Sequence, residues 1–416
     1  MTTATVSPER PSFRRALRSR PFLLLWLSQL ISQSGDFVFE VALLWLVLEV
    51  TGSVFAVGLV VAVTLIPAVV LGPFLGVYID RWDRRTILLL TNVAEGTVVA
   101  ALSALLLTHA VGLSVILVIV FLLGTGGQLV RTTTGAMVPQ VVSRDDLAPA
   151  NSLQTFSGSL NQILGLSVGG VVVALFGVTL PIEYDAVSFF VAALIIAGVS
   201  RAYSHAADAD PAGKNRFFTD FGEGIRFIRE NRFMVELILL GIIVNFFGNA
   251  AAALFAPYAK LVLHGGAATY GFLGAAVAVG AILGAAVIGK VDTRRSAGKF
   301  LMGGGVGIGL VIAALGLTTY VPFAFVEILA LGVVISITNI PLFVLVQAKV
   351  PGRLLGRVTA AFLSFIVASG PFGAFFAGSF AAATSVGLVF VISGLVVVVS
   401  MLLAVVLMKE LRDVSY

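Results

Sequence analysis

The sequence contains no cysteine and little charge, and both absences narrow what the protein can be. Without cysteine, the 416-residue chain can form no disulfide, no thiolate metal site and no cysteine nucleophile. Its three histidines lack the spacing of a metal site, and it has no phosphate-binding glycine-rich loop with its lysine. We therefore expect no enzyme activity, no metal, no cofactor and no direct use of ATP.

Charged residues make up only 11% of the chain, against roughly 25% in a soluble domain. This is too little charge to cover a surface that faces water. Hydrophobic residues make up 59%, and the mean hydropathy is +1.07, so lipid must solvate the chain. The apolar runs are long and do not alternate, which indicates helices rather than barrel strands. Twelve spans are predicted, at 21–48, 54–79, 86–108, 112–138, 151–176, 180–200, 233–260, 269–290, 298–318, 321–348, 354–381 and 385–408.

Basic residues set the predicted orientation. Of the 26 lysines and arginines, 24 fall in the two tails, in even-numbered connections or at the span ends that border those connections. The exceptions are Arg131, inside the fourth span, and Lys260, at the outer end of the seventh. The positive-inside rule then predicts a multi-pass protein with both termini in the cytoplasm. The same rule accounts for the net charge of +5, and no basic stretch carries the stacking aromatics of a nucleic-acid surface. No nucleic-acid partner is expected.

The two halves of the chain resemble each other weakly. Ser34-Gly35-Asp36 matches Phe247-Gly248-Asn249, and Gly76 matches Gly289 in the same order. We predict an N-tail at 1–20, a six-helix bundle at 21–200, a cytoplasmic linker with an amphipathic interfacial helix at 201–232, a second bundle at 233–408 and a C-tail at 409–416. A site is then expected between the halves, near the middle of the membrane.

The connection after the second span carries the sequence Gly76-Val77-Tyr78-Ile79-Asp80-Arg81-Trp82-Asp83-Arg84-Arg85. With twelve spans and a repeated half, it resembles the signature loop of the major facilitator superfamily. The resemblance implies an all-α membrane fold of two pseudo-symmetric six-helix bundles. It also implies that Gly76, Asp80, Arg81, Arg84 and Arg85 form a cytoplasmic gate that latches the halves in the outward-facing state. The alternative is that these charges only set the topology.

Two short motifs resemble the drug-efflux branch that includes bacterial macrolide exporters and enterobactin-type siderophore exporters. They are Gly35-Asp36 in the first span and Glu223-Gly224-Ile225-Arg226-Phe227-Ile228 in the linker. The antiporter motif of the fifth span is degraded, with Leu166 where proline is usual. The resemblance implies a secondary active exporter of lipophilic or amphiphilic molecules in the bacterial cytoplasmic membrane. We expect a monomer that works by proton antiport and alternating access, drawing on the proton motive force.

Charged residues at membrane depth are the candidate machinery, because a charge there is costly and usually faces a partner or a cavity. The proton-coupling candidates are Asp36, Glu40 and Glu327. Asp36 and Glu40 are four residues apart and share one helix face. Two neighbouring carboxylates in a low dielectric do not both ionise easily, so one is expected to hold a proton near neutral pH. The alternatives are a structural partner for Asp36 and ordinary outer water around Glu40.

The candidate residues of the substrate cavity lie on spans one, four, seven and ten, which line the cavity in the superfamily; they are Arg131, Asn245, Asn249, Asn339, Phe39 and Phe246. Arg131 is equally consistent with a structural counter-ion. Among the other acids in the spans, Glu95 is expected to be structural, whereas Glu183 and Asp185 are expected at the outer surface. Three alternative functions stay open: export of a siderophore or another metabolite, proton-coupled import of a nutrient, and a membrane sensor that transports nothing.

Overall fold

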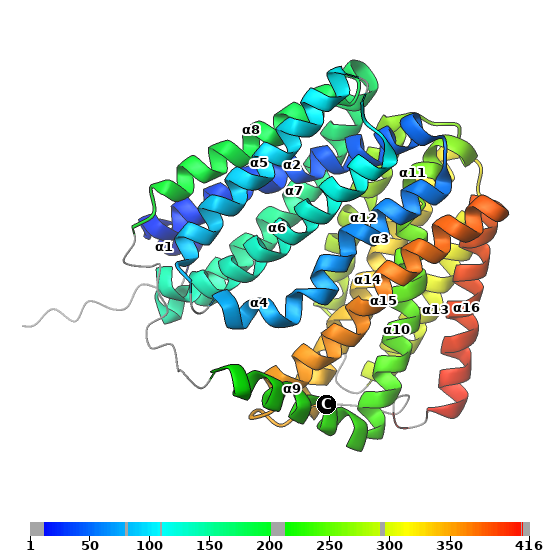
Figure 1. Ribbon diagram of the computed structural model, residues 1–416. Helices are drawn as coiled ribbons and strands as arrows, with labels where there is room; N and C mark the ends of the chain where they lie inside the picture. Colours follow the sequence, from blue (N-terminus) through cyan, green and yellow to red (C-terminus); the bar gives the residue numbers. More distant parts are fainter. Residues whose placement is uncertain are drawn as a thin grey trace, which may run out of the picture.

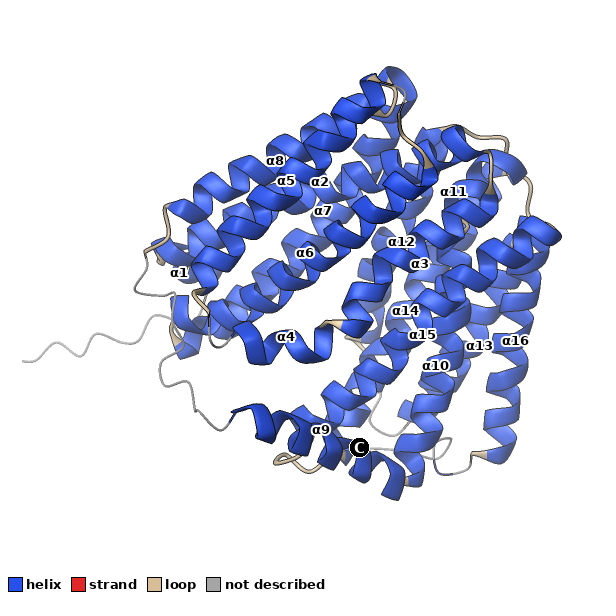
Figure 2. Ribbon diagram, in the orientation of Figure 1, coloured by secondary structure: helices blue, strands red, loops and turns tan. Residues whose placement is uncertain are grey.

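The computed structural model contains helices and no strands in the residues that it describes, which are 12–79, 82–108, 110–200, 213–291, 296–408 and 410 (Figure 2). The first half comprises α1 (Phe13–Arg18), α2 (Arg20–Thr51), α3 (Val54–Val70), α4 (Gly72–Ile79), α5 (Arg84–Leu107), α6 (Leu113–Val141), η1 (Arg144–Asp146), α7 (Leu147–Phe176) and α8 (Thr179–Ala197). The second half comprises α9 (Gly213–Glu230), α10 (Arg232–Ala253), α11 (Phe255–Pro257), the π-helical turn η3 (Tyr258–Val262), α12 (Ala267–Ile288), α13 (Ala297–Leu315), α14 (Val321–Lys349), α15 (Leu355–Ala383) and α16 (Val386–Leu407).

Eleven helices in the described ranges are long and apolar enough to cross a membrane. The second predicted span, 54–79, is instead divided into α3 and α4, which run in different directions (Figure 1). The cause is Pro73, which has no N–H and cannot continue the bonding of α3. The Leu71 N–H bonds the Pro67 carbonyl at 2.8 Å, and the Phe74 N–H then bonds the Leu71 carbonyl at 2.9 Å. The second crossing is therefore bent; counted with the eleven long helices, it confirms the twelve-helix fold.

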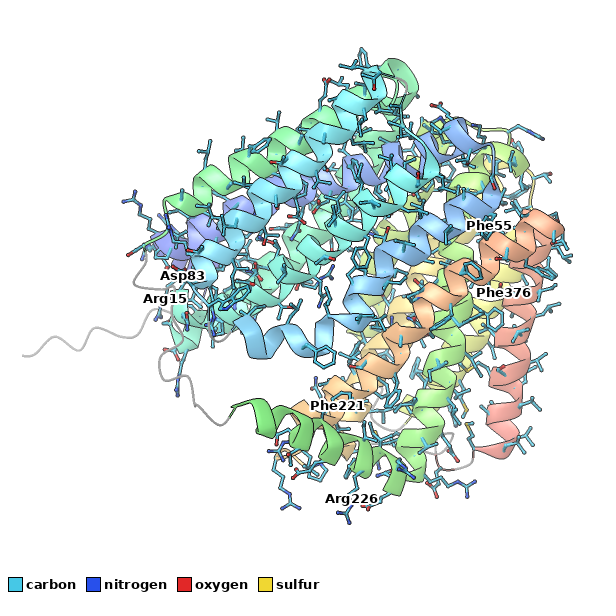
Figure 3. The ribbon with its side chains drawn as sticks, viewed as in Figure 1. Arg15, Phe55, Asp83, Phe221, Arg226 and Phe376 are labelled. Carbon is cyan, nitrogen blue, oxygen red and sulfur yellow. The ribbon has the colours of Figure 1, made fainter. Side chains whose placement is uncertain are left out.

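Each half is a bundle of its own. In the first half, α2 packs against α7 and α8, and α5 packs against α6 and α8. In the second half, α10 packs against α15, and α13 packs against α14 and α16. The two halves meet chiefly along two pairs of helices, α3 with α15 and α7 with α12. Figure 3 shows one such meeting, with Phe55 on α3 and Phe376 on the facing α15.

Glycines allow α3 to approach α15 closely, and α7 to approach α12. A methyl group at Gly58 of α3 would lie 2.6 Å from the Gly378 Cα atom of α15, and one at Gly170 of α7 would lie 3.1 Å from the Gly271 Cα atom of α12. Since glycine has no side chain, the helix backbones can touch. All four glycines lie toward the helix ends that are remote from α1 and the end of α16. We call this side of the molecule the distal face, and the halves are tightly packed there.

The linker helix α9 packs on the second half. Ile228 is buried, and Phe221 and Ile225 pack against the same apolar cluster, which α10, α15 and α16 also supply. The Arg357 side chain at the start of α15 forms an ion pair with Asp220 at 2.8 Å and a second with Glu223. Phe221, Ile225 and Ile228 of α9 thus pack against protein, whereas its exposed Arg226 points away from the bundle (Figure 3).

Replacing Arg357 tests this attachment. Arg357→Leu removes both ion pairs, and because the paired groups are partly exposed we expect a loss of about 1 kcal/mol in all. The midpoint of thermal unfolding of the purified protein should fall by roughly 1–3 °C. Arg353→Leu is the matched control, since Arg353 is exposed in the turn just before α15. Equal shifts in the two variants would contradict an anchoring role for the pairs.

Candidate functional site

A polar cavity of about 460 Å³ lies inside the first half, lined by α2, α5, α6, α7 and α8. Asp36 and Glu40 line it from the middle of α2, and both side chains are exposed despite that central position. Arg131 lines it from α6. The charges of both Glu40 and Arg131 act on Asp36. The structure therefore brings together three of the residues that the sequence singles out, two acids and one base around a shared space.

Several uncharged polar groups around this cavity lack partners. Gln29, Asn92 and Thr134 are buried lining residues. Within the described part of the chain, Gln29 Nε2, Asn92 Oδ1 and Thr134 Oγ1 have no hydrogen-bond partner. Buried polar groups are costly to leave unbonded, so water or a polar solute is expected to satisfy them. The cavity is suited to water, protons and hydrogen-bonding groups.

Two further acids belong to the same region. Glu95 of α5 lines the cavity and is only 6% exposed, and Gly126 on α6 leaves the space that its carboxylate occupies. Asp185 of α8 is 1% exposed, and its carboxylate lies against the α2 backbone at Gly35. The charges of Asp36 and Glu95 both act on Asp185. Four carboxyl groups therefore gather inside the first half.

The expectation that Asp185 lies at the outer surface is wrong. Its helix buries Ile182, Asp185 and Phe189, which recur at helical spacing on one face. That periodicity was the signal available in the sequence. Glu183, by contrast, is exposed, and it accepts a hydrogen bond from the Ser103 hydroxyl at 3.3 Å.

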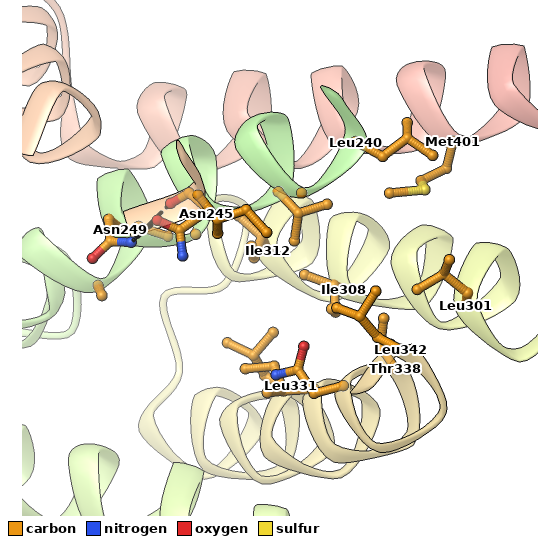
Figure 4. A pocket seen from close by; sticks show the side chains of 18 of the residues that line it. Leu240, Asn245, Asn249, Leu301, Ile308, Ile312, Leu331, Thr338, Leu342 and Met401 are labelled. Atoms are coloured by element: carbon orange, nitrogen blue, oxygen red, sulfur yellow. Dashed lines mark hydrogen bonds between the residues drawn. The ribbon is translucent and has the colours of Figure 1, made fainter. Parts of the chain in front are cut away.

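A second cavity, of about 330 Å³, lies inside the second half (Figure 4). The candidates Asn245, Asn249 and Asn339 line it, together with side chains that are mostly apolar. Asn249 Nδ2 donates to the Asn245 carbonyl at 2.8 Å and to Asn245 Oδ1 at 3.1 Å. The Ser369 hydroxyl also donates to Asn245 Oδ1, at 3.2 Å. The amides thus form a small ordered polar group in an apolar wall.

Three candidates lie apart from both cavities. Glu327 lies near the distal end of α14, where its Oε1 atom accepts a hydrogen bond from the Thr318 hydroxyl at 2.8 Å. Phe39 is buried in the main apolar core. The Phe246 ring packs against Phe247 and Phe376, with ring centres 4.9 Å and 5.6 Å away.

The gate motif is described only in part. Gly76 lies in α4, whereas Asp80 and Arg81 fall outside the described residues. Arg84 is buried and donates from Nη1 to the Ala136 carbonyl of α6 at 3.0 Å. Arg85 donates from Nη2 to the carbonyl of Ala197, at the end of α8, at 2.5 Å. These two arginines tie the start of α5 to its neighbours in the first half.

Several known transporters are similar to this chain in sequence over nearly its whole length. The transporter YvqJ of Bacillus subtilis is 24% identical over 392 residues, covering 92% of this chain and 90% of that protein. The multidrug efflux pump Tap of Mycobacterium tuberculosis is 24% identical over 414 residues, covering 94% of each chain. Macrolide efflux protein A of Streptococcus pyogenes is 22% identical over 386 residues, covering 91% and 93%.

Solved structures share the fold. A bacterial homologue of the iron transporter ferroportin superimposes with a TM-score of 0.71 at 18% identity, covering 96% of this chain and 99% of the other. The D-xylose-proton symporter gives a TM-score of 0.65 at 15% identity, covering 97% and 99%. The family model described as transmembrane secretion effector matches residues 12–414, nearly the whole chain. The chain therefore belongs to the transmembrane secretion effectors of the major facilitator superfamily and is a membrane transporter.

Proposed function

We propose that the chain is a secondary active exporter of lipophilic or amphiphilic small molecules, driven by proton antiport across the bacterial cytoplasmic membrane. The observation that carries the proposal is the pair Asp36 and Glu40, which faces a polar cavity beside Arg131 from the middle of a membrane helix. Acids in such a place are typical of proton pathways. Similarity to two proteins named for efflux supports the outward direction.

The coupling follows from the charges around Asp36. When Asp36 is ionised, it attracts Arg131 on α6 and repels Glu40. A proton arriving from outside removes that attraction and that repulsion, which changes the relative energy of the two alternating conformations. Loss of the proton toward the cytoplasm restores the starting charge. Glu327 stays a second proton-coupling candidate, because its place near the distal end of α14 suits a proton that enters from that face.

The orientation assigned to this cycle places both termini in the cytoplasm and the distal face outside. The close glycine contacts then seal the outer side, so that the conformation described is closed to the outside. The motif at 76–85 keeps its proposed role as a cytoplasmic gate. The gate is expected to close when the outer side opens. Its place suits that role, because α4, which carries Gly76, contacts α9, and α9 is fixed to the second half by Arg357.

Proteoliposomes loaded with chloramphenicol, an uncharged antibiotic with hydroxyl and carbonyl groups, test the function, with protein-free liposomes as the blank. With an inward gradient of one pH unit imposed across the liposome membrane, we expect efflux to exceed the rate without a gradient. The substrate ratio that it sustains should reach about tenfold per proton exchanged, since one pH unit supplies about 1.4 kcal/mol per proton. A proton ionophore should return the rate to baseline. Efflux that ignores the ionophore would refute proton coupling, and uptake along with protons would instead identify an importer.

A further inference from the structure

The cavity of the second half differs in chemistry from that of the first. Asp36, Glu40, Glu95 and Arg131 line the first-half cavity. Among the described residues that line the second-half cavity, none is charged. Leucine, isoleucine and valine make up about half of its lining residues, most of them on α10, α13 and α14, as Figure 4 shows for Leu240, Ile308 and Leu331. Since an unpaired ion is costly to bury in such surroundings, the cavity favours an uncharged guest.

The polar groups in this wall are few and have bonding capacity left. With the amides oriented as they are, Asn245 Oδ1 already accepts from Asn249 and Ser369, so Asn245 Nδ2 is the group left to donate. The Asn339 side chain is exposed and lines the cavity. An amide provides both a donor and an acceptor. The wall can therefore bond a carbonyl or a hydroxyl group, and it offers no counter-ion to a cation.

We propose that the second-half cavity binds the apolar body of an uncharged substrate, with Asn245 and Asn339 bonding its carbonyl or hydroxyl group. The inference rests on the proposed exporter function and assigns the proton and the substrate to different cavities. Protons are carried in the cavity of the first half, and the substrate is held in that of the second. Proton binding and substrate binding are then coupled by the movement of the two halves, and not by competition of proton and substrate for one carboxylate.

Two glycines provide matched variants. Gly248 lines the second-half cavity, and Gly135 lines the first-half cavity. A side-chain carbon added at either position meets no atom within 4 Å. Gly248→Leu and Gly135→Leu should therefore each fill one cavity without moving the backbone, and leucine suits a helix better than glycine does. Ala252→Leu, at an exposed lining position of the same cavity, is a second way to fill the second-half cavity.

Nile red, an uncharged apolar dye with one carbonyl group, is the probe. Its equilibrium binding is measured by fluorescence on the full-length protein in lipid nanodiscs, with empty nanodiscs subtracted. We expect Gly248→Leu and Ala252→Leu to weaken dye binding at least about tenfold, because the leucine side chain fills space that the dye needs and a filled cavity tolerates no further atoms without strain. Gly135→Leu should change it by less than about twofold. Asn339→Leu should weaken it by about threefold to tenfold through one lost hydrogen bond. Ethidium, a permanent cation, should not displace the dye.

Unchanged binding in both second-half variants would overturn the inference, as would an equal loss in Gly135→Leu or displacement by ethidium. The measurement uses no proton gradient and is therefore independent of the proposed function. If the dye binds as expected while chloramphenicol efflux ignores protons, proton coupling fails and the binding site stands. If efflux is proton-driven in variants whose cavity is filled, the exporter stands and the assigned site fails.

Discussion

Asp36→Asn is expected to reduce proton-driven efflux by about 100-fold, at the lower end of what the loss of a proton-transferring group costs. The amide has nearly the same shape as the carboxyl group and can still form hydrogen bonds, but it cannot take up or release a proton. It also removes the charge that attracts Arg131. The defect should therefore lie in the coupling rather than in folding, since Asp36 is exposed to the cavity and not packed in the core.

Two measurements in proteoliposomes separate a coupling defect from a structural one. The first is chloramphenicol efflux with and without an imposed proton gradient. The second is exchange of labelled chloramphenicol inside for unlabelled chloramphenicol outside at equal concentrations, which needs no net proton transfer and should persist in Asp36→Asn. Glu49→Gln is the matched control, because Glu49 lies on the same helix, exposed near its distal end. Efflux at the full rate in Asp36→Asn would refute the mechanism.

Gly58→Leu is expected to lower efflux by about tenfold by opening the distal face. A methyl group at Gly58 would already lie 2.6 Å from the Gly378 Cα atom and 2.7 Å from the Ala374 carbonyl oxygen. Both are backbone atoms that cannot move aside, so α3 and α15 must separate. Overpacking of this kind costs about 1–3 kcal/mol, and each 1.4 kcal/mol shifts a conformational equilibrium about tenfold. The balance should therefore move toward the form that is open outside.

Accessibility of a single cysteine reports that shift directly. The natural chain has no cysteine, so Asn249→Cys, in the lining of the second-half cavity, places the only thiol in the molecule. A membrane-impermeant maleimide added outside should label it in the Gly58→Leu background much faster than in the wild-type background. Gly303→Leu is the matched control, since a side-chain carbon there meets no atom within 4 Å. Equal labelling in the two glycine variants would show that the close contact does not control the conformation.

Expectations drawn from local patterns agree best with the structure. The apolar runs predicted the helices closely, because length and hydropathy alone decide whether a segment can cross a membrane. The one divided span has a local cause, the missing N–H of Pro73. The helix at Gly213–Glu230 follows from its amphipathic pattern, but its attachment to α15 depends on Arg357, more than 120 residues away in the sequence.

The candidate site was predictable only where the pattern is local. Asp36 and Glu40 are one helical turn apart, so their shared face follows from their spacing. Glu95 and Asp185 join them only because α5 and α8 pack beside α2, and because Gly35 and Gly126 leave room for the two carboxylates. Glu327 belongs to a cavity-lining span in the superfamily, yet its height along α14 places it outside both cavities.

By itself, the sequence determined the environment, the helices, the two halves and the family, because a lipid solvent imposes length, apolarity and charge placement on each segment separately. The tertiary structure alone decided which acids meet, where the halves touch and how polar each cavity is. Those properties depend on side chains from several helices, and their relative positions result from packing between residues distant in sequence. The lack of charge that first identified a membrane protein therefore leaves the few acids within its membrane helices as the main subject for experiment.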